Sequence, residues 1–231
     1  MLRANSLTLE LPVTLALFDL DNTLIAGDSD HLWGEFLISR QLVDKDHYRQ
    51  QNDNFYRDYQ NASLDIDAYL RFAINPLTQH SADFLAELHR EFMQTCIEPI
   101  ILPKALALLQ EHRERGHKLL IITATNAFIT RPIARHLGVE TLLATEPALE
   151  GGRYTGEYLG TPCYAEGKVI NLQHWLDEQR QTLNGSYFYS DSINDLPLLE
   201  QVQFPIAVNP DQRLDAIAKA RNWPILDLRS P

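Results

Sequence analysis

Two aspartates one residue apart, Asp19 and Asp21, lie in the segment FDLDNT, directly after a run of apolar residues. The run covers residues 13–18 without polar alternation, which is typical of a strand buried on both faces of a parallel sheet. Just past such a strand the backbone can turn both carboxylates toward one ligand. One carboxylate could attack phosphorus while the other moves protons. The alternative is a solvated turn capped by an aspartate.

Two later segments end in residues that suit the same chemistry. The segment 118–126 has a buried-strand pattern that ends at Thr123, whose hydroxyl could hold a phosphate oxygen or cap the next helix. The segment 186–195 is a hydrophobic strand followed by DSIND. Its Asp191 and Asp195 would supply oxygen ligands for Mg²⁺, or serve as ordinary residues of a helix start.

The segment FDLDNTL resembles the first motif of the haloacid dehalogenase-like superfamily, and the later segments follow in that family's order. The resemblance implies a phosphatase in which Asp19 is the nucleophile and Asp21 is the general acid and base. It also implies that Thr123, with the backbone amide of Ala124, orients phosphate oxygens. Lys168 would add a fixed positive charge, although a lone lysine is by itself typical of a solvated surface.

The same resemblance implies a magnesium ion held by the carboxylates of Asp19 and Asp191 and by the main-chain carbonyl of Asp21. Mg²⁺ and Lys168 would neutralise the charge of a phosphomonoester before a carboxylate attacks it. The predicted activity is Mg²⁺-dependent hydrolysis of a small phosphomonoester through an aspartyl-phosphate. A phosphotransferase using the same intermediate and a non-catalytic phosphate-binding regulator are the alternatives.

The order of helical and strand patterns predicts an α/β fold with a parallel sheet. The resemblance implies that this sheet is Rossmann-like, of the haloacid dehalogenase type, with helices on both of its faces. The predicted core covers residues 1–25 and 99–231. An inserted all-helical cap over 26–98 is similar to that of the phosphoserine phosphatase-like branch, subfamily IB. The glycine-rich segment 146–164 is expected to form a β-hairpin flap.

The individual elements follow from apolar periodicity and from turn residues. Helices are expected over residues 30–43, 45–60, 64–74, 81–98, 103–115, 126–136, 166–181, 193–201 and 211–222. Strands are expected over residues 13–18, 118–123, 141–145, 186–190, 205–208 and 224–228.

The substrate is less clearly encoded. In phosphoserine phosphatases an acidic residue seven positions after the second aspartate binds the substrate amine, and here Asp28 stands at that position, where it could equally cap a helix. Histidinol phosphate, phosphoserine, phosphoethanolamine-like compounds and sugar phosphates are the candidates. The segment 123–125 is Thr-Ala-Thr where phosphoserine phosphatases have Ser-Gly-Gly, which counts against phosphoserine. A substrate carboxylate would need an arginine, and the cap offers Arg40, Arg49, Arg57 and Arg71.

Composition is that of a globular enzyme. The 231 residues are 45% hydrophobic, and none of their segments has 18 consecutive apolar residues, so no membrane span is expected. A net charge of −11 argues against a nucleic-acid partner. The two cysteines, Cys96 and Cys163, form no disulfide framework, and the N-terminal segment lacks a signal-peptide pattern, so a cytoplasmic location is expected. The patterns do not predict an oligomeric state.

Overall fold

Six parallel strands form the central sheet of the computed structural model, which describes residues 13–230. The strands lie in the order β3-β2-β1-β6-β7-β8. Their bounds are Leu15–Phe18 (β1), Lys118–Ile122 (β2), Thr141–Leu143 (β3), Tyr187–Ser190 (β6), Phe204–Val208 (β7) and Ile225–Leu226 (β8). Since β1 is flanked on both sides by partners, its residues are completely buried. The predicted parallel α/β fold class is confirmed.

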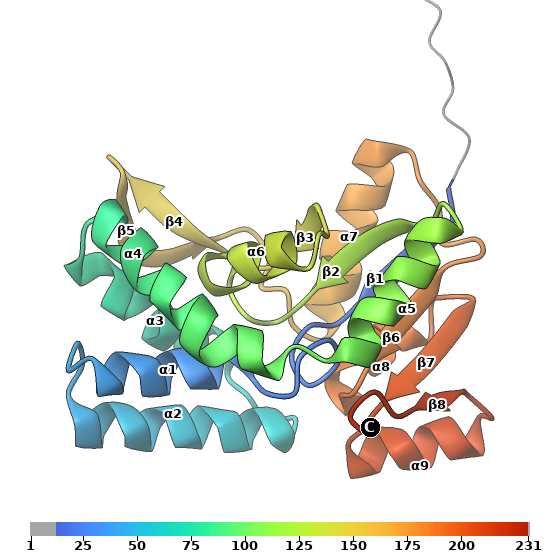
Figure 1. Ribbon diagram of the computed structural model, residues 1–231, viewed down its shortest axis with the longest axis horizontal. Coiled ribbons are helices and arrows are strands. Elements are labelled where there is room, and N and C mark those ends of the chain that lie inside the picture. The colour runs from blue at the N-terminus through green and yellow to red at the C-terminus, as the bar shows by residue number, and fades with distance from the viewer. Residues whose placement is uncertain (1–12, 231) are drawn as a thin grey trace, which may run out of the picture.

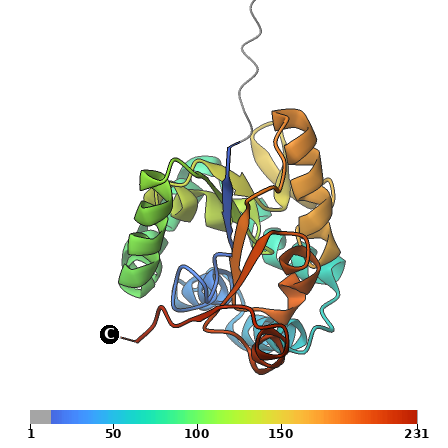
Figure 2. The same cartoon turned by 90° about the vertical axis from the view of Figure 1, so that its right-hand side faces the viewer.

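Helices cover both faces of this sheet (Figure 2). Side chains of β1 alternate between the faces: Ala16 and Phe18 belong to one hydrophobic cluster, whereas Leu15 and Leu17 belong to another. The first cluster includes residues of α5 (Pro103–Glu114) and α6 (Ala127–His136). The second includes residues of α7 (Glu166–Gln179), α8 (Leu196–Leu199) and α9 (Gln212–Ala220). The absence of polar alternation in the sequence of β1 therefore reflects burial on two sides.

Four of the helices between β1 and β2, those that precede α5 in the sequence, gather in the left half of Figure 1, away from β8. They are α1 (Ser29–Ser39), α2 (Lys45–Gln60), α3 (Ile66–Ile74) and α4 (Ala82–Phe92). Each begins at a side chain that accepts a hydrogen bond from a backbone N–H of the first turn. The capping residues are Asp28, Asp44, Asp65 and Ser81.

Shorter helical turns fill the connections: η1 (Asn75–Gln79), the π-helical η2 (Met93–Ile97), η3 (Glu98–Ile100) and η4 (Ile193–Asp195). The two segments that join the helical insertion to the sheet lie beside each other. Ile25 and Ile101 form an antiparallel bridge, and the Ala26 N–H donates to the Ile100 carbonyl at 2.8 Å. The insertion therefore leaves and re-enters the sheet region at one place.

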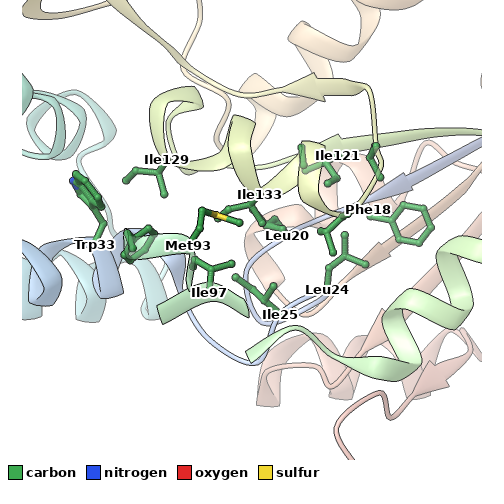
Figure 3. Packing of buried hydrophobic residues seen from close by; sticks show 14 of the residues in the cluster. Phe18, Leu20, Leu24, Ile25, Trp33, Met93, Ile97, Ile121, Ile129 and Ile133 are labelled. Carbon is green, nitrogen blue, oxygen red and sulfur yellow. The ribbon is translucent and has the colours of Figure 1, made fainter. Parts of the chain in front are cut away.

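Hydrophobic side chains continue from the sheet into the helical insertion without interruption (Figure 3). The row begins at Phe18, runs through Ile133 and Ile129 of α6, and reaches Trp33 of α1. The Trp33 ring makes an edge contact with the Phe92 ring of α4, with 5.1 Å between the ring centroids. This shared core fixes the base of the insertion against the sheet domain.

A β-hairpin follows β3. Its strands β4 (Glu146–Glu150) and β5 (Arg153–Leu159) pair antiparallel, within the segment where the sequence predicts a flap. Gly151 and Gly152 form the turn with positive φ angles of 57° and 80°, which glycine adopts without steric cost. β5 contacts α3 and η1, and Arg71 of α3 forms a 3.2 Å ion pair with Glu157. The hairpin thus lies against the helical insertion.

Several elements are shorter than expected. The helix predicted over 30–43 ends at Ser39, because Gln41 adopts a positive φ of 57° and the Leu42 N–H turns back to the Leu37 carbonyl at 3.0 Å. The helix predicted over 193–201 opens as the 3₁₀ turn η4, and α8 then covers only four residues. The last strand, predicted over 224–228, contains two residues.

The predicted core includes residues 1–12 and 231, which lie outside the described residues. The N-terminal segment, for which no signal peptide is expected, is part of residues 1–12. Within residues 13–230, none of the helices has the length and apolar character needed to cross a membrane.

Replacing Leu17 by alanine tests the importance of the central strand. Leu17 is fully buried and pairs with Leu120 and Phe188 on the neighbouring strands. We expect Leu17→Ala to lower the free energy of unfolding by about 2 to 5 kcal/mol, measured by chemical denaturation, because it leaves a cavity in a close-packed layer. Leu159→Ala, at a side chain that is 60% exposed, is the control and should change stability by less than about 0.5 kcal/mol. An equal decrease in the free energy of unfolding in the two variants would contradict the importance of Leu17 in the central strand.

Candidate active site

The carboxyl ends of β1, β2 and β6 meet at one edge of the sheet. Phe18, the last residue of β1, pairs with Ile121 of β2 on one side and with Tyr189 of β6 on the other. Polar residues follow each of these strand ends: Asp19, Thr123 and Asp191. Parallel strands deliver such residues to the same edge, which is where open α/β sheets bind ligands.

Lys168 of α7 lies beneath this edge and is only 1% exposed. Its Nζ contacts Asp19 Oδ1 at 2.8 Å and Asp195 Oδ1 at 2.7 Å. Burial by itself lowers the pKa of a lysine, but the facing carboxylates of Asp19 and Asp195 raise the pKa of Lys168 above its usual range. The side chain is therefore a permanently charged ammonium held against the first aspartate.

Gly167 allows α7 to bring Lys168 so close. A Cβ atom at this position would lie 1.9 Å from the carbonyl oxygen of Pro162, so a larger residue would push the helix start away. In the sequence, Lys168 is a candidate only because of its place in the family's motif order. The sequence does not indicate that Gly167 is needed for the close approach of the helix.

Asp195 contacts two side chains of the protein. Its carboxylate lies against Lys168 and the Ser190 hydroxyl, which donates to Asp195 Oδ2 at 2.6 Å, and the role as an oxygen ligand for Mg²⁺ indicated by the sequence stays a prediction. Asp195 is 1% exposed. Its observed contacts position the ammonium of Lys168.

Asp19 combines burial with strong neighbouring charges. Its backbone N–H donates to the Tyr189 carbonyl at 2.9 Å, which continues the pairing of β1 with β6. Burial raises the pKa of Asp19, and Asp195 and Asp21 raise it further, while Lys168 opposes them. The contact with Lys168 therefore favours the charged form that a nucleophile requires.

Asp21 contacts two other parts of the chain. Its Oδ1 accepts from the Ser29 N–H of α1 at 2.6 Å. Its Oδ2 accepts from the hydroxyls of Thr125 at 2.9 Å and Thr123 at 3.4 Å. Burial and the nearby Asp28 raise the pKa of Asp21 to about 6, so both of its protonation states are accessible near neutral pH.

Thr125 is a site residue that the sequence analysis missed. It lies in the same segment as Thr123 and Ala124, and its hydroxyl makes the shorter of the two threonine contacts with Asp21. The Thr123 hydroxyl also accepts from the Thr125 N–H at 3.2 Å, which closes the loop. The N-cap of α6 is Asn126 rather than Thr123, so Thr123 is not the helix cap that was considered.

Asp191 is linked to the turn after β1. The Thr23 hydroxyl lies 3.3 Å from Asp191 Oδ1 and 3.1 Å from the Asp191 backbone nitrogen, which donates to it. Burial raises the pKa of Asp191 well above its usual range, and the charges of Asp19 and Asp195 raise it further. Asp191 thus shares one buried region with two other carboxylates.

The charge balance of this region fits a bound divalent cation. Asp19, Asp191 and Asp195 are three carboxylates, and Lys168 is the cation that contacts two of them. Within residues 13–230 no trio of acidic, histidine or cysteine side chains is placed to enclose a metal. The carboxylates of Asp19 and Asp191 with the backbone carbonyl of Asp21 would leave positions for water and substrate, as Mg²⁺ prefers.

Asp28 caps α1: its Oδ1 accepts from the His31 N–H at 2.8 Å. The helix-capping alternative is therefore observed. Asp28 also lines a pocket together with Asp19, Asp21 and Ala124, so its proposed contact with a substrate amine stays a prediction. Burial, reinforced by the charge of Asp30, raises the pKa of Asp28 to about 7.

This pocket lies between the sheet edge and helices α1 to α3. Its cavity has a volume of about 30 Å³, enough for one or two water molecules. It is lined by Asp19, Asp21, Asp28, Asp30, His31, Asn52, Phe55, Tyr56, Tyr59, Leu64, Tyr69, Thr123, Ala124 and Thr125.

Two hydrogen bonds join the end of α2 to the sheet domain: Asn194 Nδ2 donates to the Tyr59 carbonyl at 3.0 Å, and Arg213 Nη2 donates to the Gln60 carbonyl at 2.9 Å.

The chain is similar to several known proteins over almost its whole length. The histidinol-phosphatase of Neisseria meningitidis serogroup C is 49% identical over 219 residues, which cover 93% of this chain and 99% of that protein. A solved Bordetella pertussis protein of unknown function is 42% identical with a TM-score of 0.88 and covers 94% of this chain and 100% of its own. A phosphoserine phosphatase with bound substrate has the same fold, with 17% identity, a TM-score of 0.66, and coverage of 90% and 91%.

The model of the haloacid dehalogenase-like hydrolases matches residues 16–200, which contain Asp19, Lys168 and Asp195. The sequence predicts that this protein is an enzyme of this family and a phosphatase. These relatives confirm both predictions. The chain belongs to the haloacid dehalogenase-like hydrolase family.

Proposed function

We propose that this protein is a Mg²⁺-dependent phosphomonoester hydrolase that works through an aspartyl-phosphate on Asp19. The observation that carries the proposal is the buried contact of Lys168 with Asp19 and Asp195, beside a second aspartate in the same pocket. Burial raises the pKa of Asp19, and the fixed ammonium of Lys168 opposes this rise and favours the charged form that attacks. The positive charge of Lys168 also attracts a phosphate.

In the first step an oxygen of Asp19 forms a bond to phosphorus while the bond to the leaving alcohol breaks. Asp21 in its protonated form transfers its proton to the departing oxygen. In the second step Asp21 accepts a proton from a water molecule, which attacks the phosphorus and releases Asp19 as a carboxylate. The hydroxyls of Thr123 and Thr125 hold Asp21 in place, and Thr123 with the backbone amide of Ala124 would orient the phosphate oxygens.

Asp19, Asp191 and the main-chain carbonyl of Asp21 are the groups that would hold Mg²⁺. When bound, the ion supplies positive charge that offsets the repulsion between an anionic nucleophile and a phosphate dianion. Lys168 supplies the second positive charge from the protein itself. Its position is fixed by Asp195, so its charge costs little reorganisation during the reaction.

Residues 26–98 would act as a cap on a core formed by residues 1–25 and 99–231, with the hairpin segment 146–164 as a flap beside the cap. The cavity of about 30 Å³ supports this, because it is too small for a phosphorylated metabolite. A substrate would enter when the cap moves away, and closure would exclude water. The contact of the Ser29 N–H with Asp21, at the base of the cap, would hold the acid in place.

The proposed substrate is a small phosphomonoester that bears an amine, and histidinol phosphate is the leading candidate, given the 49% identical relative named as a histidinol-phosphatase. Asp28 in the pocket is consistent with a cationic substrate. A cytoplasmic location is also proposed, since both cysteines are free thiols.

Asparagine substitutions at the two aspartates test the proposed chemistry. We expect Asp19→Asn to reduce phosphate release from histidinol phosphate by at least about a thousandfold, because an amide is not a nucleophile of this kind. Asp21→Asn should slow turnover severely through loss of proton transfer, by roughly a hundredfold or more. Asp46→Asn, at an exposed residue of α2, is the matched control. Asp19→Asn activity above about one part in a thousand would refute the assigned nucleophile.

Metal dependence forms a separate test. Removal of Mg²⁺ with a chelator should abolish turnover, and added Mg²⁺ should restore it. For Asp191→Asn we expect the Mg²⁺ concentration at half-maximal activity to rise by at least about tenfold, because one carboxylate ligand is lost. Asp83→Asn, at an exposed residue of α4, should titrate like the unaltered protein. An unchanged titration for Asp191→Asn would remove Asp191 from the metal site.

A further inference from the structure

Asp30, in the first turn of α1, is a buried carboxylate to which the proposed reaction assigns no task. Its side chain lines the pocket, and the residue is only 5% exposed. Within residues 13–230, nothing donates a hydrogen bond to its Oδ1. A buried carboxylate oxygen without a partner is costly, and the cost falls sharply when a cation or a hydrogen-bond donor reaches it.

The surroundings of Asp30 favour a positively charged group. Burial raises the pKa of Asp30 to about 7, and the Tyr69 side chain opposes this rise by favouring the charged carboxylate. Asp28 adds a second acidic group, and the rings of Tyr56 and Tyr59 line the same pocket. Carboxylates and aromatic faces both attract cations. Among the described residues that line this pocket there is no lysine and no arginine.

The arginines that could have bound a substrate carboxylate contact other groups. Arg40 pairs with Glu91, and Arg49 pairs with Glu35 at 2.6 Å. Arg71 pairs with Glu157 of the hairpin at 3.2 Å. Arg57 donates to Asn54 on an exposed part of α2. A carboxylate in the pocket would therefore face Asp28 and Asp30 without a compensating cation, and this would oppose its binding.

We propose that Asp30 binds the positively charged nitrogen of the substrate and that the substrate is the phosphomonoester of a small amino alcohol without a carboxylate. This inference rests on the proposed phosphatase function and narrows it. Asp28 has one oxygen engaged in capping α1, whereas Asp30 has a buried oxygen still to be paired. Phosphoserine, which carries an amine and a carboxylate, is thereby disfavoured relative to histidinol phosphate.

The Asp30→Asn variant tests the subsite. Steady-state kinetics would be measured with histidinol phosphate, with phosphoserine and with 4-nitrophenyl phosphate, whose leaving group has no amine. The unaltered protein should have a kcat/KM for histidinol phosphate at least about tenfold above that for phosphoserine. Asp30→Asn should lower the ratio of kcat/KM for histidinol phosphate to that for 4-nitrophenyl phosphate by at least about tenfold, mainly through KM. The control Asp46→Asn should keep the unaltered ratio.

Thermal unfolding separates a binding role from a structural one. Because Asp30→Asn removes a buried charge and keeps the side chain's shape, the variant should melt no lower than the unaltered protein at pH 8. A lower melting temperature combined with an unchanged substrate ratio would make Asp30 structural and overturn the proposal.

Calorimetric titration with histidinol and with histidine, in the presence of Mg²⁺ and inorganic phosphate, does not depend on turnover. Histidinol should bind the unaltered protein at least about tenfold more tightly than histidine does, and Asp30→Asn should remove this preference. If histidinol binding depends on Asp30 and no ester releases phosphate, the result would support the subsite and contradict the proposed phosphatase activity. Phosphate release that favours phosphoserine, or histidinol binding unaffected by Asp30→Asn, would overturn the subsite and leave the phosphatase standing.

Discussion

The ion pairs of Lys168 with Asp19 and Asp195 are the interaction on which the rest of the site depends. A buried charge loses its hydration, and opposite charges or hydrogen bonds must compensate for that loss. The three side chains come from α7, from the end of β1 and from the turn after β6. Their mutual requirement therefore ties three distant parts of the sequence to one point of the sheet edge.

The remaining charges follow from this arrangement. With Lys168 engaged by two aspartates, Asp191 is a further carboxyl group in the same region. Burial raises the pKa of Asp191, and the charges of Asp19 and Asp195 raise it further. A divalent cation would relieve this repulsion, which is the physical reason for the proposed Mg²⁺ dependence. A second group of acids, Asp28 and Asp30, lines the same pocket from the start of α1. The carboxylates around Lys168 would act on the phosphate, and Asp28 and Asp30 would contact the organic part of the substrate.

Much of this architecture can be read from the sequence, because buried parallel strands and capped helices leave local patterns. The apolar run before Asp19 and the capping residues Asp28 and Ser81 are examples. Element ends are less predictable: the end of α1 depends on the left-handed backbone of Gln41, and β8 contains two residues in the place of a longer apolar segment. These features are set by tertiary packing rather than by local preference.

The site residues divide in the same way. Asp19 and Asp21 are visible because they follow a strand, whereas the importance of Lys168 comes largely from its contact with Asp19, which is 149 positions away in the chain. The contact between Thr125 and Asp21 spans 104 positions, and the burial of Asp30 depends on how α1 packs. A sequence pattern indicates which residues could react, but only the folded structure shows which charges are paired and which are left to a ligand.

The most direct measurement of the proposed reaction is identification of the phosphorylated residue during turnover. The protein would be quenched in acid while hydrolysing histidinol phosphate, reduced with borohydride to convert an acyl-phosphate to homoserine, digested, and mapped by mass spectrometry. The proposed mechanism predicts homoserine at position 19 and unmodified aspartate at positions 21 and 191. Active turnover without modification of Asp19, or modification at another aspartate, would contradict it.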